Sequence, residues 1–255
     1  MSKLFASERR LKIMEILNKK KRITVKELSN ITKVSEATLR LDLTKLEEEG
    51  LLNRTHGGAV LIESPNNETV FSVRKKKNKE QKVEIAKKAL GLISNGYCIL
   101  LDASSTGLEL ADLLKKSSLR LTVLTSGIYT ALELRENPNI TVILLGGVVR
   151  NGSSSLEGTL GINILNQINV DIMFTSANGF SFDTGLTDFN VYEVELKKEM
   201  VKHSKRVAAL IDHSKINKSS IAAFASLNDL DYFICDSQIN PIDLERLKNY
   251  DLEIL

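Results

Sequence analysis

Polar residues follow several apolar runs between residue 97 and the C-terminus, and their types are those that hold an anion. The run "YCILLD" ends in Asp102, and Ser104, Ser105 and Thr106 follow it at the start of a helical pattern. Backbone N–H groups at a helix N-terminus attract a phosphate group, and a carboxylate can accept hydrogen bonds from sugar hydroxyls. The same residues also fit a plain capped helix, so both interpretations stay open.

Four further loops of compatible chemistry follow other apolar runs. In a parallel sheet the carboxyl ends of the strands lie at one edge, so such loops converge there. Each loop alone fits a plain turn, but their convergence favours a binding site. The residues concerned are Thr125, Ser126 and Gly127; Gly146, Gly147 and Arg150; Asn178, Gly179, Gly185, Leu186 and Thr187; and Asp212, His213, Ser214 and Lys215.

The elements that must position these loops alternate between strands and helices. Strand-like runs cover residues 97–102, 121–125, 140–147, 170–176, 206–212 and 231–236. Helical patterns lie between most of them, at residues 107–116, 129–137 and 190–204. Buried runs rich in Val, Ile and Leu that alternate with amphipathic helices predict an α/β domain with a mostly parallel sheet covered on both faces.

A second candidate for chemistry is the stretch "NRTHGGAV" at residues 53–60, where His56 precedes two glycines. A metal site would need further ligands, but the other two histidines of the chain lie in the predicted α/β domain. A phosphate-binding loop would need a strand before the glycines and a helix after them, and that context is missing. We therefore expect Gly57 and Gly58 to form a tight turn, with Arg54 and His56 on the strand that enters it.

Charge is distributed unevenly along the chain, although its formal net value is only +3. Residues 1–88 carry +9, and residues 89–255 carry −6. A basic head on an acidic body indicates that the head meets a polyanion, although a basic solvated surface would have the same composition.

Residues 8–50 are predicted to be helical throughout. Thr24 and Glu27 in "TVKEL" form a capping-box pattern that begins a second helix, in which Val25 and Leu28 face inward. The turn "NITKV" then leads to a third helix. In the first helix, "RRLKIMEILNKK", the residues expected on one inner side are Leu11, Met14, Ile16 and Leu17.

The third helix is expected from its N-cap Ser35 to about Glu49, with Gly50 ending it. Leu39, Leu43 and Leu46 fall on one inner stripe. The opposite face suits base edges and phosphates, because arginine reaches a phosphate or guanine and apolar side chains suit thymine methyl groups. An ordinary surface helix remains the alternative. That outer face carries Ala37, Leu41, Thr44 and Glu48, flanked by Arg40 on one side and by Thr38 and Lys45 on the other.

These motifs resemble the DNA-binding domain of the DeoR family of bacterial transcriptional regulators. "ERRLKIMEILNKKKRITVKEL", "VSEATLRLDLTKLEEEGLL" and "RTHGGAVL" follow that family's signature in order and spacing over residues 8–61. The resemblance implies a winged helix-turn-helix, with the strand pair after the third helix as the wing, and double-stranded operator DNA as partner. The expected DNA contacts are Thr24, Ser35, Glu36, Ala37, Thr38, Arg40, Leu41, Thr44, Lys45, Arg54 and His56.

One position departs from the family pattern. The family usually has two basic residues before the "DL" of the third helix, and here the second is Leu41. We expect fewer polar contacts from this helix and a preference for A·T-rich operator positions.

Residues 76–236 resemble the effector domain of the same family, whose fold is similar to ribose-5-phosphate isomerase. The resemblance implies a pocket for a phosphorylated sugar. Glu193 and Lys197 stand at i, i+4 on one helix face, where a stabilising ion pair is the alternative role. The residues implied are Asp102, Ser104, Ser105, Thr106, Thr125, Gly147, Arg150, Asn178, Gly179, Thr187, Glu193, Lys197, Asp212 and Lys215.

The expected organisation is a mainly α winged helix-turn-helix in residues 1–62, a linker in 63–75, and an α/β effector-binding and oligomerisation domain in 76–255. We expect a DNA-binding regulator, a repressor of sugar-metabolism genes that a phosphorylated sugar releases, acting as a homodimer or tetramer. We expect no catalytic residue, metal or cofactor. No apolar run approaches the roughly 20 residues that span a bilayer, and the N-terminus lacks a secretory signal, so we expect a cytoplasmic protein.

Two other classes of function fit parts of the sequence. Carboxylates and lysines around a sugar phosphate suit proton transfer in an aldose–ketose isomerase, but a basic recognition module has no use in a plain isomerase. An architectural DNA binder would need no pocket, and the acidic second domain would repel DNA.

Overall fold

The computed structural model describes residues 6–48, 51–61, 71, 74–150 and 153–255. The chain divides into two compact units, Met1–Val70 and Phe71–Leu255. Most of the predicted linker, residues 63–75, lies outside the described residues. The domain boundaries at residues 62 and 76 therefore stay predictions.

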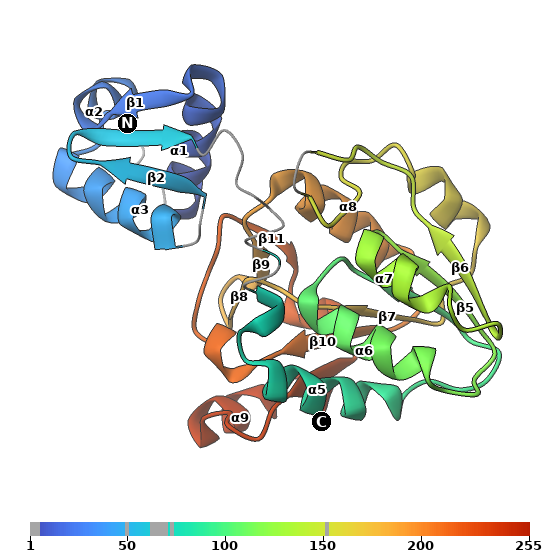
Figure 1. The fold of residues 1–255 in the computed structure, drawn as a ribbon. Coiled ribbons are helices and arrows are strands. Elements are labelled where there is room, and N and C mark those ends of the chain that lie inside the picture. Colours follow the sequence, from blue (N-terminus) through green and yellow to red (C-terminus); the bar gives the residue numbers. More distant parts are fainter. Residues whose placement is uncertain (1–5, 49–50, 62–70, 72–73, 151–152) are drawn as a thin grey trace. The chain divides into compact units, whose positions relative to one another are not determined.

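The N-terminal unit is a helix-turn-helix followed by a wing (Figure 1). The wing strands pair antiparallel with a short third strand in the order β1-β3-β2, so the predicted winged fold is confirmed. The elements are α1 (Ala6–Lys20), β1 (Arg22–Thr24), α2 (Val25–Thr32), α3 (Glu36–Glu48), β2 (Leu52–Thr55) and β3 (Gly58–Leu61).

The expectation that residues 8–50 are entirely helical was wrong at β1. Lys21 has a left-handed backbone with φ 67°, which ends α1. The chain then runs extended, and Ile23 pairs with Ala59 of β3 and is buried. Pairing with a strand more than thirty residues away overrides the local helical preference here, and no local pattern reports it.

The inner side of α1 also differs from the expected one. Ile13 and Leu17 are fully buried, whereas Leu11, Met14 and Ile16 are only partly buried. The i, i+4 pair of Ile13 and Leu17 therefore defines the buried stripe of α1.

The helix-turn-helix begins both α2 and α3 with the predicted capping residues. Thr24 Oγ1 accepts a hydrogen bond from Glu27 N at 3.2 Å, and Thr24 N donates to Glu27 Oε2 at 2.9 Å, which completes the capping box. Lys33 is left-handed and closes α2, and Ser35 Oγ accepts from Thr38 N at 3.3 Å at the start of α3. The predicted end of α3 falls on residues 49–50, outside the described residues.

A buried ion pair joins α1 to α3. Arg9 donates to both carboxylate oxygens of Asp42, and the Nη2–Oδ1 distance is 3.0 Å. Leu39, Leu43 and Leu46, the predicted inner stripe of α3, are fully buried on the same side. The rotation of α3 about its axis is thus fixed both by apolar packing and by a bidentate charge pair.

The two glycines of the wing have different structural roles, one in the turn and one in a strand. The two-residue turn consists of His56 and Gly57, one residue earlier than predicted, and Gly58 is the first residue of β3. Gly58 pairs with Thr24, and a Cβ atom on Gly58 would lie 2.1 Å from Ile23 O. Gly58 is therefore needed for the close approach of β1, whereas Gly57 has open space around it.

The C-terminal unit confirms the predicted α/β class. Within the described residues, seven strands form one parallel sheet in the order β13-β12-β10-β7-β4-β5-β6. They are β4 (Cys98–Leu101), β5 (Leu121–Thr125), β6 (Ile140–Leu144), β7 (Ile172–Thr175), β10 (Val207–Ile211), β12 (Tyr232–Cys235) and β13 (Glu253–Ile254).

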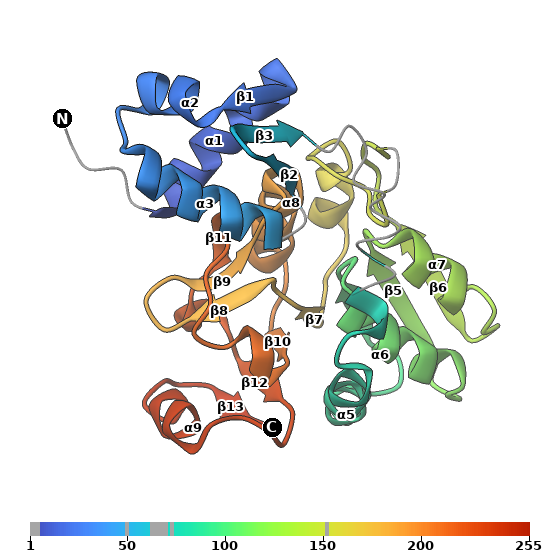
Figure 2. The same cartoon turned by 60° about the vertical axis from the view of Figure 1, so that its left-hand side comes forward.

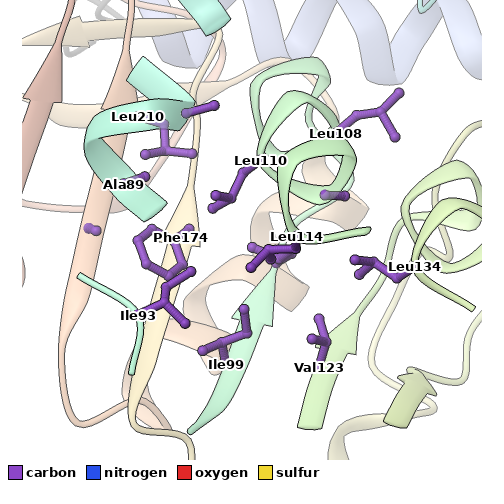
Figure 3. Packing of buried hydrophobic residues seen from close by; sticks show 14 of the residues in the cluster. Ala89, Ile93, Ile99, Leu108, Leu110, Leu114, Val123, Leu134, Phe174 and Leu210 are labelled. Atoms are coloured by element: carbon purple, nitrogen blue, oxygen red, sulfur yellow. The ribbon is translucent and has the colours of Figure 1, made fainter. Parts of the chain in front are cut away.

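Helices cover both faces of this sheet. On one face lie α5 (Lys79–Leu90), α6 (Ser105–Lys115) and α7 (Ile128–Leu134), as Figure 1 shows. They pack on alternate strand residues such as Ile99, Val123 and Phe174, whose side chains meet Leu110 and Leu114 of α6 (Figure 3). On the other face Leu100 and Met173 pack against α8 (Val191–Lys202), which lies on the opposite side of the sheet in Figure 2.

A small antiparallel sheet lies beside α8. Its strands β8 (Gly179–Ser181), β9 (Gly185–Asp188) and β11 (Ala222–Ala225) are ordered β11-β9-β8. Short 3₁₀ turns are η1 (Ile162–Gln167), η2 (His213–Lys215) and η3 (Leu227–Asp229), and α9 (Pro241–Leu247) precedes β13. Cys98 and Cys235 are both free thiols, with Cys235 buried and Cys98 partly buried. Among the described residues, no helix is long and apolar enough to cross a membrane.

The two wing glycines provide a matched pair of variants. We expect Gly58→Ala to lower the free energy of unfolding of the N-terminal unit by ~1–3 kcal/mol, because the new methyl group overlaps the β1 backbone. Gly57→Ala should change it by less than about 0.5 kcal/mol. Thermal unfolding of both variants, followed by circular dichroism, checks this. Equal loss of stability in the two variants would contradict the assignment of the turn.

Candidate functional site

The centre of the candidate site lies where the strand order of the large sheet reverses. The chain places β5 and β6 on one side of β4, and β7 and the later strands on the other, so β4 and β7 are neighbours at a topological switch point. Ligands of open α/β sheets bind at the carboxyl ends of the strands beside such a point. Here the residues at these ends are Asp102, after β4, and Thr175 and Ser176, at the end of β7.

Asp102 is fully buried and accepts hydrogen bonds on both oxygens. Oδ1 accepts from Ser104 N at 3.0 Å. Oδ2 accepts from Thr175 Oγ1 and from Ser176 N, both at 2.8 Å. Asp102 therefore joins the ends of β4 and β7 and the start of α6, and it orders this strand edge before any ligand arrives.

Lys197 of α8 supplies the countercharge. Its Nζ lies 3.1 Å from Asp102 Oδ2, 2.9 Å from Asp188 Oδ2 and 2.8 Å from Ser176 O. Burial alone would lower the pKa of Lys197, but Asp188 and Asp102 outweigh it and hold that pKa above its ordinary value. Burial would likewise raise the pKa of Asp102, but Lys197 and the hydrogen bonds hold it below its usual range.

The N-terminus of α6 adjoins this cluster and contains one buried polar atom without a hydrogen-bond partner among the described residues. Ser104 caps the helix by accepting from Gly107 N at 2.9 Å, as its sequence position suggested. Ser105 and Thr106 are buried, and Thr106 Oγ1 has no hydrogen-bond partner among the described residues. Thr125 ends the next strand, is fully buried, and accepts from Gly127 N at 3.0 Å. A Cβ on Gly127 would lie 3.1 Å from Ala103 Cα, so the two loops are packed together.

Lys215 and Asp212 enter from η2. Lys215 Nζ donates to Ser176 Oγ at 2.8 Å and lies 3.7 Å from Asp212 Oδ2. Burial lowers the pKa of Lys215, although Asp212 opposes that effect. Asp212 Oδ1 accepts from Asn78 Nδ2 at 3.0 Å. This contact brings the start of α5 to the same edge of the sheet.

Two cations in this region were missed by the sequence prediction. Lys82 is buried, and its Nζ donates to Lys77 O at 2.7 Å and to Arg74 O. Burial, together with the charge of Lys215, lowers the pKa of Lys82 to about 8. The guanidinium of Arg74 lies 5.6 Å from the ring centroids of both Phe71 and Phe189, and its Nε is buried with no partner among the described residues.

Glu193 occupies a different position from the one its i, i+4 spacing suggested. Lys197 forms ion pairs with Asp102 and Asp188, whereas Glu193 Oε1 accepts from Ser155 Oγ at 2.7 Å and from Asn190 Nδ2 at 3.2 Å. Burial, and then the charge of Asp188, raise the pKa of Glu193.

Gly147 and Arg150 belong to a segment that connects to this carboxylate. Arg150 Nε lies 2.7 Å from Glu157 Oε2, and its guanidinium stacks over Tyr192 at 4.2 Å. Asn190 Nδ2 joins Glu157 to Glu193, with a 2.9 Å bond to Glu157 Oε1. A Cβ on Gly147 would lie 2.8 Å from Glu157 O, so this glycine allows close backbone packing.

The remaining predicted residues form a neighbouring network in the small sheet. Thr187 Oγ1 donates to Gly179 O at 2.9 Å and accepts from Ser220 N at 2.8 Å. Asn178 Nδ2 donates to Ser220 Oγ at 3.3 Å. These contacts hold β8, β9 and the segment before β11 together.

Part of what the sequence prediction missed carried a readable signal. Ser176 ends the run "VDIMFTS" just as Asp102 ends "YCILLD", so the same strand-end rule finds it. Lys82 stands at helical spacing with Ile85, Ala86 and Ala89, all of which are buried. Its burial was thus readable from periodicity. We find no comparable signal for Arg74.

The second candidate surface is the outer face of α3 with the wing. Ser35, Glu36, Ala37, Arg40, Leu41, Lys45 and His56 are exposed, and Thr38, Thr44 and Arg54 are partly buried. Arg54 Nη1 donates to Thr44 Oγ1 at 2.8 Å, and Arg54 N donates to Glu47 Oε1 at 2.7 Å. The wing strand is therefore fastened to the outer face of α3. Thr24 is exposed, but its hydroxyl is engaged in the capping box.

Comparison with family models identifies both units. Residues 9–65 match the DeoR-like helix-turn-helix domain, and residues 77–237 match the DeoR C terminal sensor domain. The chain belongs to the DeoR family. Members of this family are regulators of transcription, so the expectation of a DNA-binding regulator, and not an enzyme, is confirmed.

Relatives of the DeoR family match along nearly the whole chain. The HTH-type transcriptional regulator GolR of Listeria innocua serovar 6a is 46% identical and matches over 98% of each chain. The HTH-type transcriptional repressor GlcR of Bacillus subtilis is 32% identical over 99% of this chain and 96% of its own. Among solved structures, ribose 5-phosphate isomerase A of Methanocaldococcus jannaschii matches with a TM-score of 0.42 and 19% identity, over 55% of each chain.

The buried position of Lys197 leads to a pH-dependent prediction. Without this charge, burial would raise the pKa of Asp102 above its unfolded value of about 3.9, so stability would be lost as the pH rises through the raised pKa. In the wild type the pKa of Asp102 is depressed, so its contribution is present at neutral pH and is lost as the pH falls through the folded value. We expect the free energy of unfolding of Lys197→Met to be ~3–5 kcal/mol below that of the wild type at neutral pH. The difference should be smaller at about pH 4.

Urea unfolding across this pH range measures the deficit, with Lys198→Met, at the exposed next position of α8, as the control. A deficit for Lys197→Met that does not depend on pH would contradict the charge assignment.

Proposed function

We propose that this DeoR-family regulator represses sugar-metabolism genes and that a phosphorylated sugar, bound at the carboxyl edge of the large sheet, lowers its affinity for operator DNA. The observation that carries the proposal is the buried Thr106 hydroxyl, which is unpartnered among the described residues. It lies in the first turn of α6, the helix that follows the buried Asp102 of the Lys197 ion pair. A buried polar atom of this kind costs free energy unless a ligand or water satisfies it.

The phosphate group would lie among the cations of this edge. Burial lowers the pKa values of both Lys82 and Lys215, to about 8 for Lys82. The charges of Lys215 and Arg74 add to the lowering at Lys82, and the charge of Arg74 adds to it at Lys215. An anion among these three groups would relieve their mutual repulsion and favour their charged forms. The N-terminal N–H groups of α6 would add donors to the same phosphate.

The sugar hydroxyls would donate hydrogen bonds to carboxylates that still have accepting capacity. Asp102 is saturated by Ser104, Thr175, Ser176 and Lys197, so we assign it a positioning role. Glu193 is partly exposed and sits close enough to Asp188 for its pKa to be raised. A sugar hydroxyl donating to Glu193 would favour its charged form, which is why we assign the sugar end of the ligand to it.

Coupling to DNA binding would start from the segment that precedes α5. Lys82 Nζ holds Arg74 O and Lys77 O, and the Arg74 side chain lies against Phe71, the first residue of the C-terminal unit. A phosphate that draws in Lys82 or Arg74 would move this segment, which continues toward the DNA-binding unit. Such a ligand shifts the population between two states by its differential affinity for them.

DNA recognition is assigned to the outer face of α3, with the wing alongside. Phosphate contacts by basic residues supply most of the affinity and make it depend on salt. The relative GlcR is named a repressor, which supports repression as the sense of regulation. We propose a homodimer or tetramer, since paired recognition helices suit a two-fold operator, and a cytoplasmic location, where operator DNA is accessible.

The effector site is tested by Lys215→Ala. Loss of this cation should weaken binding of the phosphorylated sugar at least tenfold, because a hydrogen bond to a charged group is worth ~1.5–3 kcal/mol. Thermal shift with a panel of pentose and hexose phosphates, each alongside the free sugar and inorganic phosphate, measures this. Lys218→Ala, an exposed lysine three positions later, is the control. Stabilisation by a phosphosugar that is the same in both variants would count against the site.

The DNA surface is tested by Lys45→Ala. If Lys45 contacts a phosphate, the variant should bind operator DNA more weakly at all sequences, and the slope of log affinity against log salt should fall by about 0.9. Mobility-shift titrations at several salt concentrations measure the slope. Lys248→Ala, which removes one exposed charge from the C-terminal unit, should leave it unchanged. Identical slopes for wild type and Lys45→Ala would remove Lys45 from the interface.

A further inference from the structure

We propose that Leu41, with Ala37 one turn before it, determines operator specificity by apolar contact with the C5-methyl groups of thymine bases. The inference rests on the proposed function, in which the outer face of α3 lies in the major groove. It adds a mode of readout and a base class, which that proposal leaves open.

The first observation is the exposure of Leu41. Its side chain is 72% exposed, compared with 45% for Ile31, the other exposed large hydrophobic residue in the described part of the N-terminal unit. The buried stripe of Leu39, Leu43 and Leu46 fixes the rotation of α3. At 100° per residue, Leu41 lies about 200° from Leu39, on the opposite side of the helix. The fold therefore presents Leu41 directly outward.

The second observation is that polar side chains around Leu41 are engaged with each other. Arg40 Nη2 donates to Glu36 Oε2 at 3.2 Å, one turn earlier on the same helix. Thr44 Oγ1 donates to Arg40 O and accepts from Arg54 Nη1, both at 2.8 Å. These bonds hold the polar groups along the helix surface and leave Leu41 standing between them.

The third observation concerns the start of α3. Ser35 Oγ and Thr38 Oγ1 lie 2.9 Å apart, and Ser35 also accepts from Thr38 N. These hydroxyls are therefore occupied in capping the helix. Between them and Leu41 the outward residue is Ala37, which is exposed and has only a methyl side chain. Ala37 and Leu41 together make an apolar ridge along the middle of the outer face.

The chemistry of the major groove identifies what such a ridge can recognise. Thymine is the base that presents a methyl group there, whereas guanine, adenine and cytosine present hydrogen-bonding groups. Contact with a thymine methyl removes apolar surface of Leu41 from water, and a cytosine in its place would leave an amino group facing a leucine. Leu41 thus favours thymine both by attraction and by exclusion.

The experiment removes single methyl groups from the DNA. A duplex library with a random central segment is selected on the full-length wild-type chain, and the preferred duplex becomes the probe. Each of its thymines is then replaced in turn by deoxyuridine, which lacks only the C5-methyl group. Affinities are measured for the wild type, for Leu41→Ala and for Ile31→Ala, whose exposed side chain lies on α2 and serves as the control.

At one or two thymine positions, wild type and Ile31→Ala should bind the deoxyuridine duplex about fourfold more weakly, which corresponds to ~0.8 kcal/mol for one buried methyl group. Leu41→Ala should bind the thymine and deoxyuridine duplexes equally at those positions. If a preferred duplex is selected but no substitution distinguishes Leu41→Ala from wild type, the inference is overturned and DNA binding stands. If no sequence preference emerges, the proposed DNA recognition by α3 fails as well.

Discussion

The amino group of Lys197 lies buried between carboxylates that belong to two different sheets. Asp102 follows β4 of the large parallel sheet, and Asp188 ends β9 of the small antiparallel sheet. Lys197 also reaches Ser176 O at the end of β7. Removing Lys197 would leave both carboxylates buried without this countercharge, which costs several kcal/mol. The relative placement of the strand ends, and with it the candidate site, depends on this arrangement.

A cluster of buried charges stabilises a fold poorly for its desolvation cost, since apolar residues of similar volume often stabilise it as well. Here the cluster continues beyond what the ion pairs need. Lys82 is buried and Lys215 is partly buried, both have lowered pKa values, and the Thr106 hydroxyl is unsatisfied within the described residues. Groups whose environments disfavour their charge or leave their hydrogen bonds unmade are typical of binding sites. An anionic ligand satisfies all of them at once.

The segment before α5 connects the charge cluster to the boundary between the two units. Arg74 and Lys82 come from the part of the chain that directly follows the DNA-binding unit, yet both belong to the charge cluster. In the proposed mechanism, a ligand bound at this cluster acts on the chain at the point where it leaves one unit and enters the other. In the N-terminal unit a hydrogen bond from Arg54 to Thr44 joins the wing to α3.

Sequence patterns predicted most elements, because apolar periodicity and capping residues act locally. Leu39, Leu43 and Leu46, the capping box at Thr24 and the strand ends at Asp102 and Thr125 are where such patterns indicated. Long-range pairing was not readable: β1 is extended because Ile23 pairs with Ala59, and Gly58 is required by the backbone of β1. The partners of Lys197 were missed because Asp188 is on another sheet, and i, i+4 spacing pointed to Glu193 instead.

The central claim is that ligand and operator are linked through one chain, and reciprocity tests it most directly. The phosphosugar that gives the largest thermal shift is titrated into the chain with and without saturating operator DNA, and operator affinity is measured with and without that phosphosugar. Linkage predicts that both affinities fall by the same factor, on the order of fivefold or more. A phosphosugar that binds tightly while leaving operator affinity unchanged would contradict the account.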